Sequence, residues 1–247
     1  MVTIMLSSCR RESFIDGRTG IKVLFYPEYN MFPADWYTGE VKARVKALSL
    51  SEIKRSTSTI LKAMNKYPIS ILTDNISRIY ILQNMNFYGV NYAGTYDDNI
   101  VFLVNNGREN GYSDRFMEQS FHHEFSSVLY WNYIDYFDRK AWLAAHEGSD
   151  SIYFDELGGA GAMISGQDSD SFDPWYHEKG FLYEYATSSF ENDFNSFAEN
   201  IFCPEPGFWE AVDKYERLNK KIKIIVDFYH SIDPTFTESY FRNMDNN

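Results

Sequence analysis

The chain has 247 residues, of which 44% are apolar, and this composition predicts one large domain with a sizeable core. Its formal net charge of −12 excludes the basic surface that nucleic-acid-binding proteins need and disfavours docking on anionic lipid. With only two cysteines, neither a disulfide framework nor a cysteine-rich zinc site is expected. The chain has no run of about 20 apolar residues, so no membrane-spanning helix is predicted.

The N-terminal residues carry a short motif. Residues 6–9 read Leu-Ser-Ser-Cys, which fits the lipobox of bacterial lipoproteins, whose cysteine is acylated after signal cleavage. We therefore interpret residues 1–20 as a truncated lipoprotein signal with a flexible leader, and residues 21–247 as a single domain. A lipid on Cys9 would tether this domain to the bacterial cell envelope, at the outer membrane and facing the periplasm or the surface. A disulfide between Cys9 and Cys203 is the less favoured alternative.

Patterns typical of strands dominate the first half of the chain. Residues 21–26 form a branched and aromatic run that Pro27 ends, which predicts a strand. Residues 51–66 show apolar residues at helical spacing. Residues 76–82 and 99–104 are again rich in branched residues. Because Gly and Asp between them supply turns, we predict an antiparallel pair with a long connection.

Helical patterns dominate the second half. Helices are predicted over residues 114–133, 137–146, 190–203 and 207–230. Ser113 or Asp114 caps the first of these. Residues 147–180, with the glycine run at 158–161, are predicted to be a long irregular loop. A mixed sheet followed by helices predicts one α+β domain.

The helix predicted over 114–133 separates its residues into distinct faces. Four apolar side chains share one side of the helical wheel and predict the core face: Met117, Phe121, Phe125 and Val128. His123 and Ser127 lie one turn apart on another face, roughly 120° round, and Glu124 lies on the border.

Residues 123–127 read His-Glu-Phe-Ser-Ser, which is close to the His-Glu-x-x-His motif of zinc metallopeptidases. In that motif two histidines at positions i and i+4 bind one zinc ion, and the glutamate takes a proton from the zinc-bound water. In this chain Ser127 replaces the second histidine. A serine hydroxyl is a neutral, weak ligand that is too short to replace an imidazole, so the strict motif is broken.

The segment 121–129 resembles the active-site helix of a zinc-binding metallopeptidase family of bacterial lipoproteins, which usually has histidine at the place of Ser127. Gly180-Phe181, Tyr185-Ala186 and the acidic segment 191–199 are similar to the tyrosine and the Asp-Phe-Ala-Glu helix of that family. The catalytic domain of anthrax lethal factor has a comparable layout. The resemblance implies a zincin-like α+β fold, with a small mixed sheet over an active-site helix and a helical subdomain after it.

The resemblance also implies residue roles. His123 matches the first zinc ligand and Glu124 matches the general base. Tyr185 matches the tyrosine that hydrogen-bonds a developing oxyanion. His177, in the irregular segment before Tyr185, is the best substitute for the missing histidine ligand.

The third zinc ligand is ambiguous. The acidic position of the family falls on Asn192 by strict spacing, and Glu191 and Asp193 flank it at the border of the apolar stripe of their helix. We favour Glu191 or Asp193 as the ligand. Glu199 lies opposite the stripe and is the poorer candidate on wheel geometry.

Each of these residues also has a structural interpretation. His123 could be a hydrogen-bonded helix histidine, and Glu191 and Asp193 could be first-turn acids that the helix dipole favours. Lysines 220, 221 and 223 are predicted on a solvated face of the last helix, and histidines 146 and 230 are predicted at the surface.

Two functions from different classes follow. The first is a zinc-dependent metallopeptidase that hydrolyses peptide or protein substrates with a metal-activated water, impaired because Ser127 replaces a ligand. The second is an inactive pseudo-peptidase that binds peptides or glycans at the cell surface. Zinc content and peptide binding discriminate between them.

Overall fold

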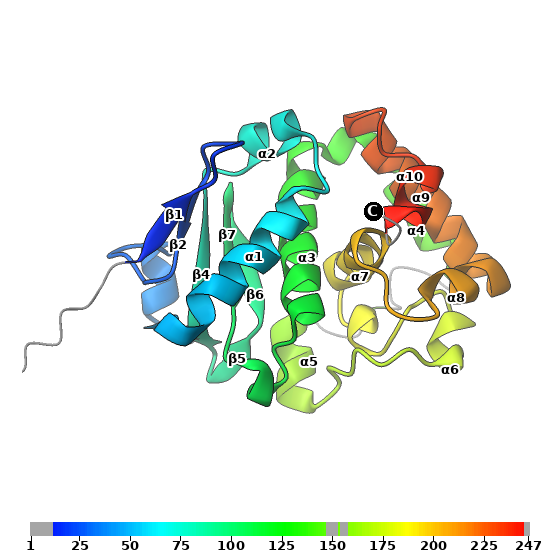
Figure 1. Ribbon diagram of the computed structural model, residues 1–247. Helices are drawn as coiled ribbons and strands as arrows, with labels where there is room; N and C mark the ends of the chain where they lie inside the picture. The colour runs from blue at the N-terminus through cyan, green and yellow to red at the C-terminus, as the bar shows by residue number, and fades with distance from the viewer. Residues whose placement is uncertain (1–11, 147–152, 154–157, 245–247) are drawn as a thin grey trace, which may run out of the picture.

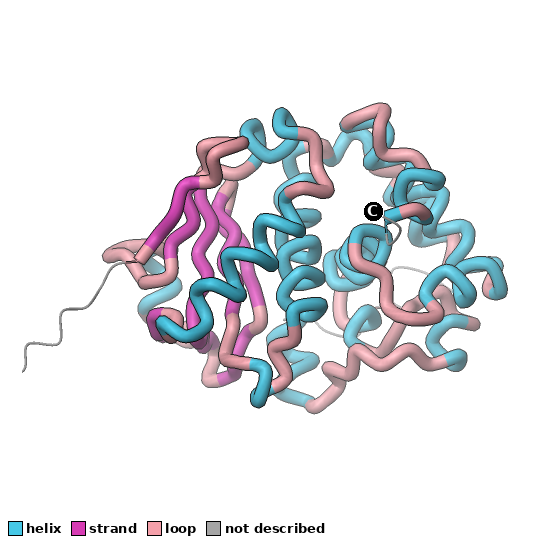
Figure 2. Tube along the Cα trace, in the orientation of Figure 1, coloured by secondary structure: helices cyan, strands magenta, loops and turns pink. Residues whose placement is uncertain are grey.

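The computed structural model describes residues 12–146, 153 and 158–244. Its strands lie on one side of the molecule, α1 and α3 run beside them, and α7 to α10 form the other side (Figures 1 and 2). The prediction of an α+β protein, with a mixed sheet first and helices after, is confirmed. Among the described residues, no helix is both long enough and apolar enough to cross a membrane.

The strands are β1 (Ser13–Ile15), β2 (Lys22–Leu24), β3 (Arg44–Ala47), β4 (Arg78–Phe87), β5 (Val90–Tyr92), β6 (Gly94–Asp97) and β7 (Ile100–Val104). The helices are α1 (Ile53–Met64), α2 (Ile69–Asn75), α3 (Asp114–Asn132), α4 (Arg139–Ala144), α5 (Gly159–Ser165), α6 (Pro174–His177), α7 (Phe190–Phe202), α8 (Phe208–Lys214), α9 (Glu216–Ile232) and α10 (Glu238–Arg242).

Within the described chain the strands form one sheet in the order β1-β2-β4-β7-β6, and β3 and β5 also pair with β4. The predicted antiparallel pairing of β4 with β7 is wrong, because the two strands are parallel, with Ile79 opposite Val101. The chain reverses twice between them, at Tyr88-Gly89 and again at Asp98. Tyr88, Gly89 and Asp98 all have positive φ. Two reversals restore the original strand direction.

Both faces of the sheet are covered, and side chains alternate between them. In β4, Ile79 and Ile81 join the larger core on the side of the helices. Tyr80 and Leu82 join a smaller core on the opposite face. Residues 26–43 contribute Met31 and Phe32 to this smaller core. The sheet is therefore a rigid support for the helix that lies across its edge.

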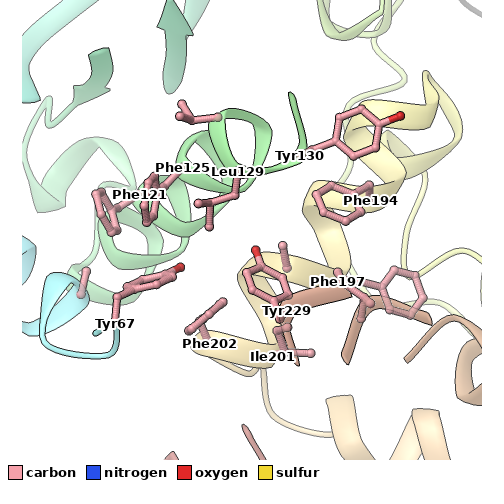
Figure 3. Close-up of a cluster of buried hydrophobic side chains, with 14 of the residues drawn as sticks. Tyr67, Phe121, Phe125, Leu129, Tyr130, Phe194, Phe197, Ile201, Phe202 and Tyr229 are labelled. Atoms are coloured by element: carbon pink, nitrogen blue, oxygen red, sulfur yellow. The ribbon is translucent and has the colours of Figure 1, made fainter. Parts of the chain in front are cut away.

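The larger core is strongly aromatic where α3 meets α7. Figure 3 shows Phe121 and Phe125 of α3 close to Tyr67, with Phe202 of α7 and Tyr229 of α9 on the other side. The rings of Tyr67 and Phe202 stack with their centroids 4.3 Å apart. This packing fixes α7 against α3 and thereby places the polar residues of the two helices opposite each other.

The structure differs from the sequence predictions in three further places. The helix predicted over 207–230 is two helices, α8 and α9, because Tyr215 between them has an extended backbone. The glycine run predicted as loop begins α5. Residues 13–15, expected to belong to the flexible leader, form β1 and pair with β2. Cys9 lies outside the described residues.

Candidate functional site

The predicted central helix is confirmed as α3, which the Ser113 side chain caps by accepting a hydrogen bond from the backbone N–H of Phe116 at 3.0 Å. Helix α3 packs against β6 and β7 on one side and against α7 on the other (Figure 1). His123 and Glu124 lie near its middle. Their side chains therefore project where the edge of the sheet meets the helical half of the molecule.

The carboxylate of Glu124 lies against the edge strand β6. A methyl group added at Gly94 would stand only 2.5 Å from Oε1 of Glu124, so the missing side chain at Gly94 makes room for the carboxylate. Burial raises the pKa of Glu124 to about 7, the nearby charge of His123 opposes the shift, and Glu191 and Glu199 add to it. Glu124 is therefore a carboxyl group that exchanges protons near neutral pH.

His123 is in direct contact with Glu199 of α7. Its Nδ1 lies 2.8 Å from Oε2 of Glu199, and both side chains are 14% exposed. Tyr183 donates a hydrogen bond to the other oxygen of the same carboxylate. Burial lowers the pKa of His123, but the hydrogen bond and charge of Glu199 outweigh burial and raise it to about 9.

This contact corrects the ranking of Glu199 as the poorer candidate. The ranking assumed that the face opposite the apolar stripe of α7 points to solvent. Ten of the thirteen residues of α7 are buried, because the helix packs against both α3 and α9. The face away from the apolar stripe carries Glu199 towards α3 and His123.

Ser127, at the place of the second histidine, is tied down by a different residue. Its side chain is 1% exposed, and its hydroxyl accepts a hydrogen bond of 2.8 Å from Nδ2 of Asn195. The carbonyl oxygen of the same amide accepts a hydrogen bond of 2.7 Å from Ser126. Asn195 therefore holds both serines, and its amide uses its donor and its acceptor to do so.

These donors do not fit a catalytic zinc ion. Such an ion has three protein ligands. In the part of the chain that the structure describes, Glu199 is the one carboxylate that hydrogen-bonds His123, and Ser127 stands where the motif has its second histidine. Among the described residues, no group of three or more His, Cys, Asp or Glu side chains is arranged to hold a metal ion.

The structure brings Tyr185 and Glu191 into the same place as His123 and Glu124. The rings of Tyr185 and His123 are 6.4 Å apart between centroids. Glu191 lines the same cavity as both. Glu191 also lies beside Tyr96 of the same cavity. Burial raises the pKa of Tyr96 above its usual range, and the charge of Glu191 and its hydrogen bond with Tyr96 add to this shift. Four of the six predicted site residues are therefore neighbours.

The structure does not bring Asp193 into this place. Asp193 is fully buried on the side of α7 that faces α9. Its carboxylate accepts hydrogen bonds of 2.8 Å from Trp142, 3.0 Å from His146, 2.8 Å from Tyr153 and 2.6 Å from Lys221. Because these donors surround the carboxylate, Asp193 has a structural role in the core.

This buried cluster corrects two further predictions. Lys221 was predicted on a solvated face, but its side chain is fully buried, with its ammonium 4.7 Å from the ring centroids of Trp142 and Phe181. His146 was predicted at the surface and is 5% exposed. Both residues are buried because the Asp193 charge needs partners inside the protein.

His177 also lies away from His123. It is 4% exposed, and its ring packs against Tyr215 at 5.2 Å and Phe172 at 5.5 Å between centroids. It lines neither of the cavities beside His123. His177 is therefore not positioned to replace the missing histidine.

Two cavities meet at His123 and form one cleft. They share Tyr92, Gly94, His123, Glu124 and Tyr185 as lining residues. We call the larger one, of about 740 Å³, the wide lobe; its lining includes Tyr96, Tyr130, Trp131, Arg139, Phe190 and Glu191. We call the smaller one, of about 330 Å³, the narrow lobe; its lining includes Tyr112, Phe116, Met163, Asp168, Asp170 and Tyr183.

The edge strand β6 presents backbone groups to this cleft. The N–H of Val104 in β7 donates to the C=O of Ala93 at 2.8 Å. Because bonding alternates along an antiparallel pair, Thr95 also turns its backbone groups towards β7. The intervening Gly94 and Tyr96 therefore direct their N–H and C=O groups to the outer edge, where both residues line the wide lobe.

No family model matches the chain, and no curated protein matches it. Among solved structures, the chain is similar to a protein from Bacteroides caccae described as a "putative zinc-binding metallo-peptidase". The two share 12% identity, with a TM-score of 0.53 over 93% of this chain and 87% of that one. The chain shares the overall fold of that protein. At this identity the likeness shows the fold alone.

Proposed function

We propose that the chain is a peptide-binding protein that keeps the cleft of a zincin-like metallopeptidase without a catalytic zinc ion. The observation that carries the proposal is the pair of contacts at the motif: His123 with Glu199, and Ser127 with Asn195. The first contact joins His123, the expected first zinc ligand, directly to Glu199. The second engages the serine that stands where the second histidine belongs.

The shape of the cleft supports an extended peptide as its occupant. A peptide can add as a further strand to an exposed sheet edge, with backbone hydrogen bonds giving affinity and pockets for alternate side chains giving specificity. Gly94 and Tyr96 offer backbone groups at such an edge. The wide and narrow lobes lie on either side of His123 along this edge and provide the pockets.

Zinc-dependent hydrolysis is the second candidate. It is favoured by Glu124 and Tyr185, which lie beside His123 as in the family that the helix resembles. The fold likeness to a protein described as zinc-binding favours it as well. The available ligands disfavour it. Among the described residues, Glu199 is the one acidic side chain in contact with His123, and no third side chain completes a set of three zinc ligands.

Zinc content and peptide retention separate the two candidates. Protein purified without chelator is analysed for zinc, then mixed with a decapeptide library and passed through a size-exclusion column. We expect well below one zinc ion per chain, with retention of a peptide subset that is unchanged by EDTA. Stoichiometric zinc that is lost in His123→Ala, or retention of no peptide, would contradict the proposal.

The cellular setting stays a proposal from the sequence. A lipid on Cys9 would hold the cleft at the bacterial cell envelope, where extracellular or periplasmic peptides are its ligands. Cys9 lies outside the described residues, and palmitate labelling of the expressed lipoprotein and of Cys9→Ser tests the anchor.

A further inference from the structure

We infer that the narrow lobe of the cleft binds a lysine or arginine side chain of the peptide. This inference rests on the proposed function and adds to it the chemical class of peptide that the cleft selects. Three features support the inference: the apolar lining of the narrow lobe, the carboxylates in that lining, and the distribution of charge along the cleft.

The walls of the narrow lobe suit the stem of a long basic side chain. Tyr112 and Phe116 meet edge to face with centroids 5.3 Å apart. Met163 and Tyr183 add further apolar and aromatic surface to the lining. Lysine and arginine cover apolar surface with their methylene groups while their charged ends reach more polar surroundings.

The carboxylates of the narrow lobe suit the charged end of such a side chain. Asp168 and Asp170 are exposed and line the lobe. Within the described chain, no Lys or Arg forms a salt bridge with either of them. Glu124 adds a third carboxyl group, whereas the charge of Glu199 is balanced by His123. The lining includes no Lys or Arg.

The wide lobe differs in charge. Its lining holds Arg139 as well as Glu191, and the guanidinium of Arg139 lies 4.9 Å from the ring centroid of Phe190. Trp131 and Ile134, both exposed, add apolar surface to the same lobe. Negative charge therefore gathers at the narrow lobe, and a peptide that places a basic residue there has complementary charge.

The direction of β6 predicts where the basic residue stands in the peptide. The chain runs from Asn91 at the narrow lobe to Tyr96 at the wide lobe. A peptide that pairs antiparallel with β6 runs the other way and enters from the wide lobe. Its basic residue then lies on the C-terminal side of the residue next to His123.

The test compares fluorescein-labelled decapeptides that carry one lysine at each position in turn, in a background of alanine and serine, with matched peptides that carry norleucine. Norleucine keeps the methylene stem and lacks the charge. Fluorescence anisotropy is measured on the wild type, on Asp168→Asn/Asp170→Asn, and on Asp74→Asn/Asp227→Asn. The last pair makes the same charge change at exposed residues that line neither lobe.

At one position the wild type is expected to prefer lysine over norleucine by about fivefold, the size of one or two exposed ion pairs. The preference should vanish in Asp168→Asn/Asp170→Asn, persist in the control pair, and weaken with added salt. Equal binding of lysine and norleucine peptides at every position overturns the inference and leaves the proposed function standing. Binding of neither series overturns both.

Discussion

Asn195 of α7 holds Ser127 of α3 through a hydrogen bond of 2.8 Å between the amide nitrogen and the hydroxyl. The serine occupies the place where a zincin has its second histidine, so the contact stabilises the altered motif from the neighbouring helix. Its neighbour one turn earlier, His123, is held by Glu199 of the same α7 helix. Two hydrogen bonds therefore join the same two helices at the two positions where the motif would place histidine ligands.

The first prediction concerns the restoration of a metal site. Ser127 lines the wide lobe, so a longer side chain at this position has space to project into the cavity. Ser127→His combined with Asn195→Ala supplies a second imidazole one turn from His123, next to Glu199. We expect this variant to retain about one zinc ion per chain by elemental analysis.

The matched control is Ser127→Gln with Asn195→Ala, which adds a side chain of similar size that is a poor zinc ligand. It should remain free of zinc, like the wild type. A wild type that binds zinc as tightly as Ser127→His/Asn195→Ala would show that Ser127 does not prevent zinc binding.

The second prediction concerns the contact of Gly94 with Glu124. Gly94→Ala places a methyl group against the Glu124 carboxylate and should displace it from β6. We expect the displaced Glu124 carboxylate to lose one charge-assisted hydrogen bond to the bound peptide. This loss should weaken peptide binding by roughly tenfold, which fluorescence anisotropy can measure. Gly17→Ala is the control, because Gly17 has no atom within 4 Å of the added methyl. Unchanged affinity in Gly94→Ala would exclude Glu124 as a peptide contact.

The third prediction concerns the buried pair of Asp193 and Lys221. Asp193→Asn leaves the Lys221 charge buried without its counter-ion, and we expect a loss of about 3–5 kcal/mol in the free energy of unfolding. Asp193→Asn/Lys221→Met removes both charges and should cost less than Asp193→Asn alone. Urea denaturation of the three proteins measures this order. A double variant less stable than the single variant would contradict the account of this cluster.

The fourth prediction concerns stability at low pH. Burial acts to raise the pKa of Asp193, but Lys221 and His146 outweigh it and hold the value below the usual 3.8. Burial also acts to raise the pKa of Glu118, but the nearby His122 ring and the ammonium groups of Lys62 and Lys66 hold it well below 4.5. A carboxylate with a lowered folded pKa contributes stability above its unfolded pKa and loses it as pH falls towards the folded value.

The free energy of unfolding should therefore decrease as pH falls below about 4.5 and keep decreasing towards pH 2. Urea titrations at several pH values measure the slope. Asp193→Asn should show a shallower decrease than the wild type, while Asp227→Asn, an exposed control, should follow the wild type. Parallel curves for the wild type and Asp193→Asn would show that Asp193 does not titrate with a lowered pKa.

The helix with the motif could be predicted from the sequence because its signals are local. The Ser113 cap, the apolar spacing and the His-Glu pair all lie within one helix, and the structure has α3 at Asp114–Asn132. The parallel pairing of β4 with β7 could not be predicted in the same way. It depends on the two chain reversals between these strands. The number of reversals in a glycine-rich connection cannot be predicted from the sequence pattern.

The partners on α7 were harder to predict because that helix is packed on two sides. Phe190, Phe194, Phe197 and Ile201 form the stripe that periodicity reveals. Glu199 lies opposite that stripe and Asp193 lies at its border, yet Glu199 meets His123 and Asp193 meets Lys221. Polar residues that pair across a helix interface leave no apolar pattern, so which partner each one meets depends on the tertiary packing.

The most direct test of a peptide-binding cleft without catalytic zinc is liquid chromatography with mass spectrometry of the decapeptide library after incubation with the protein. The reaction is run with added zinc and, separately, with EDTA, on the wild type and on Glu124→Gln. We predict intact peptides in every reaction, with the same subset retained in the presence of zinc and of EDTA. Zinc-dependent cleavage that EDTA and Glu124→Gln both abolish would contradict this account.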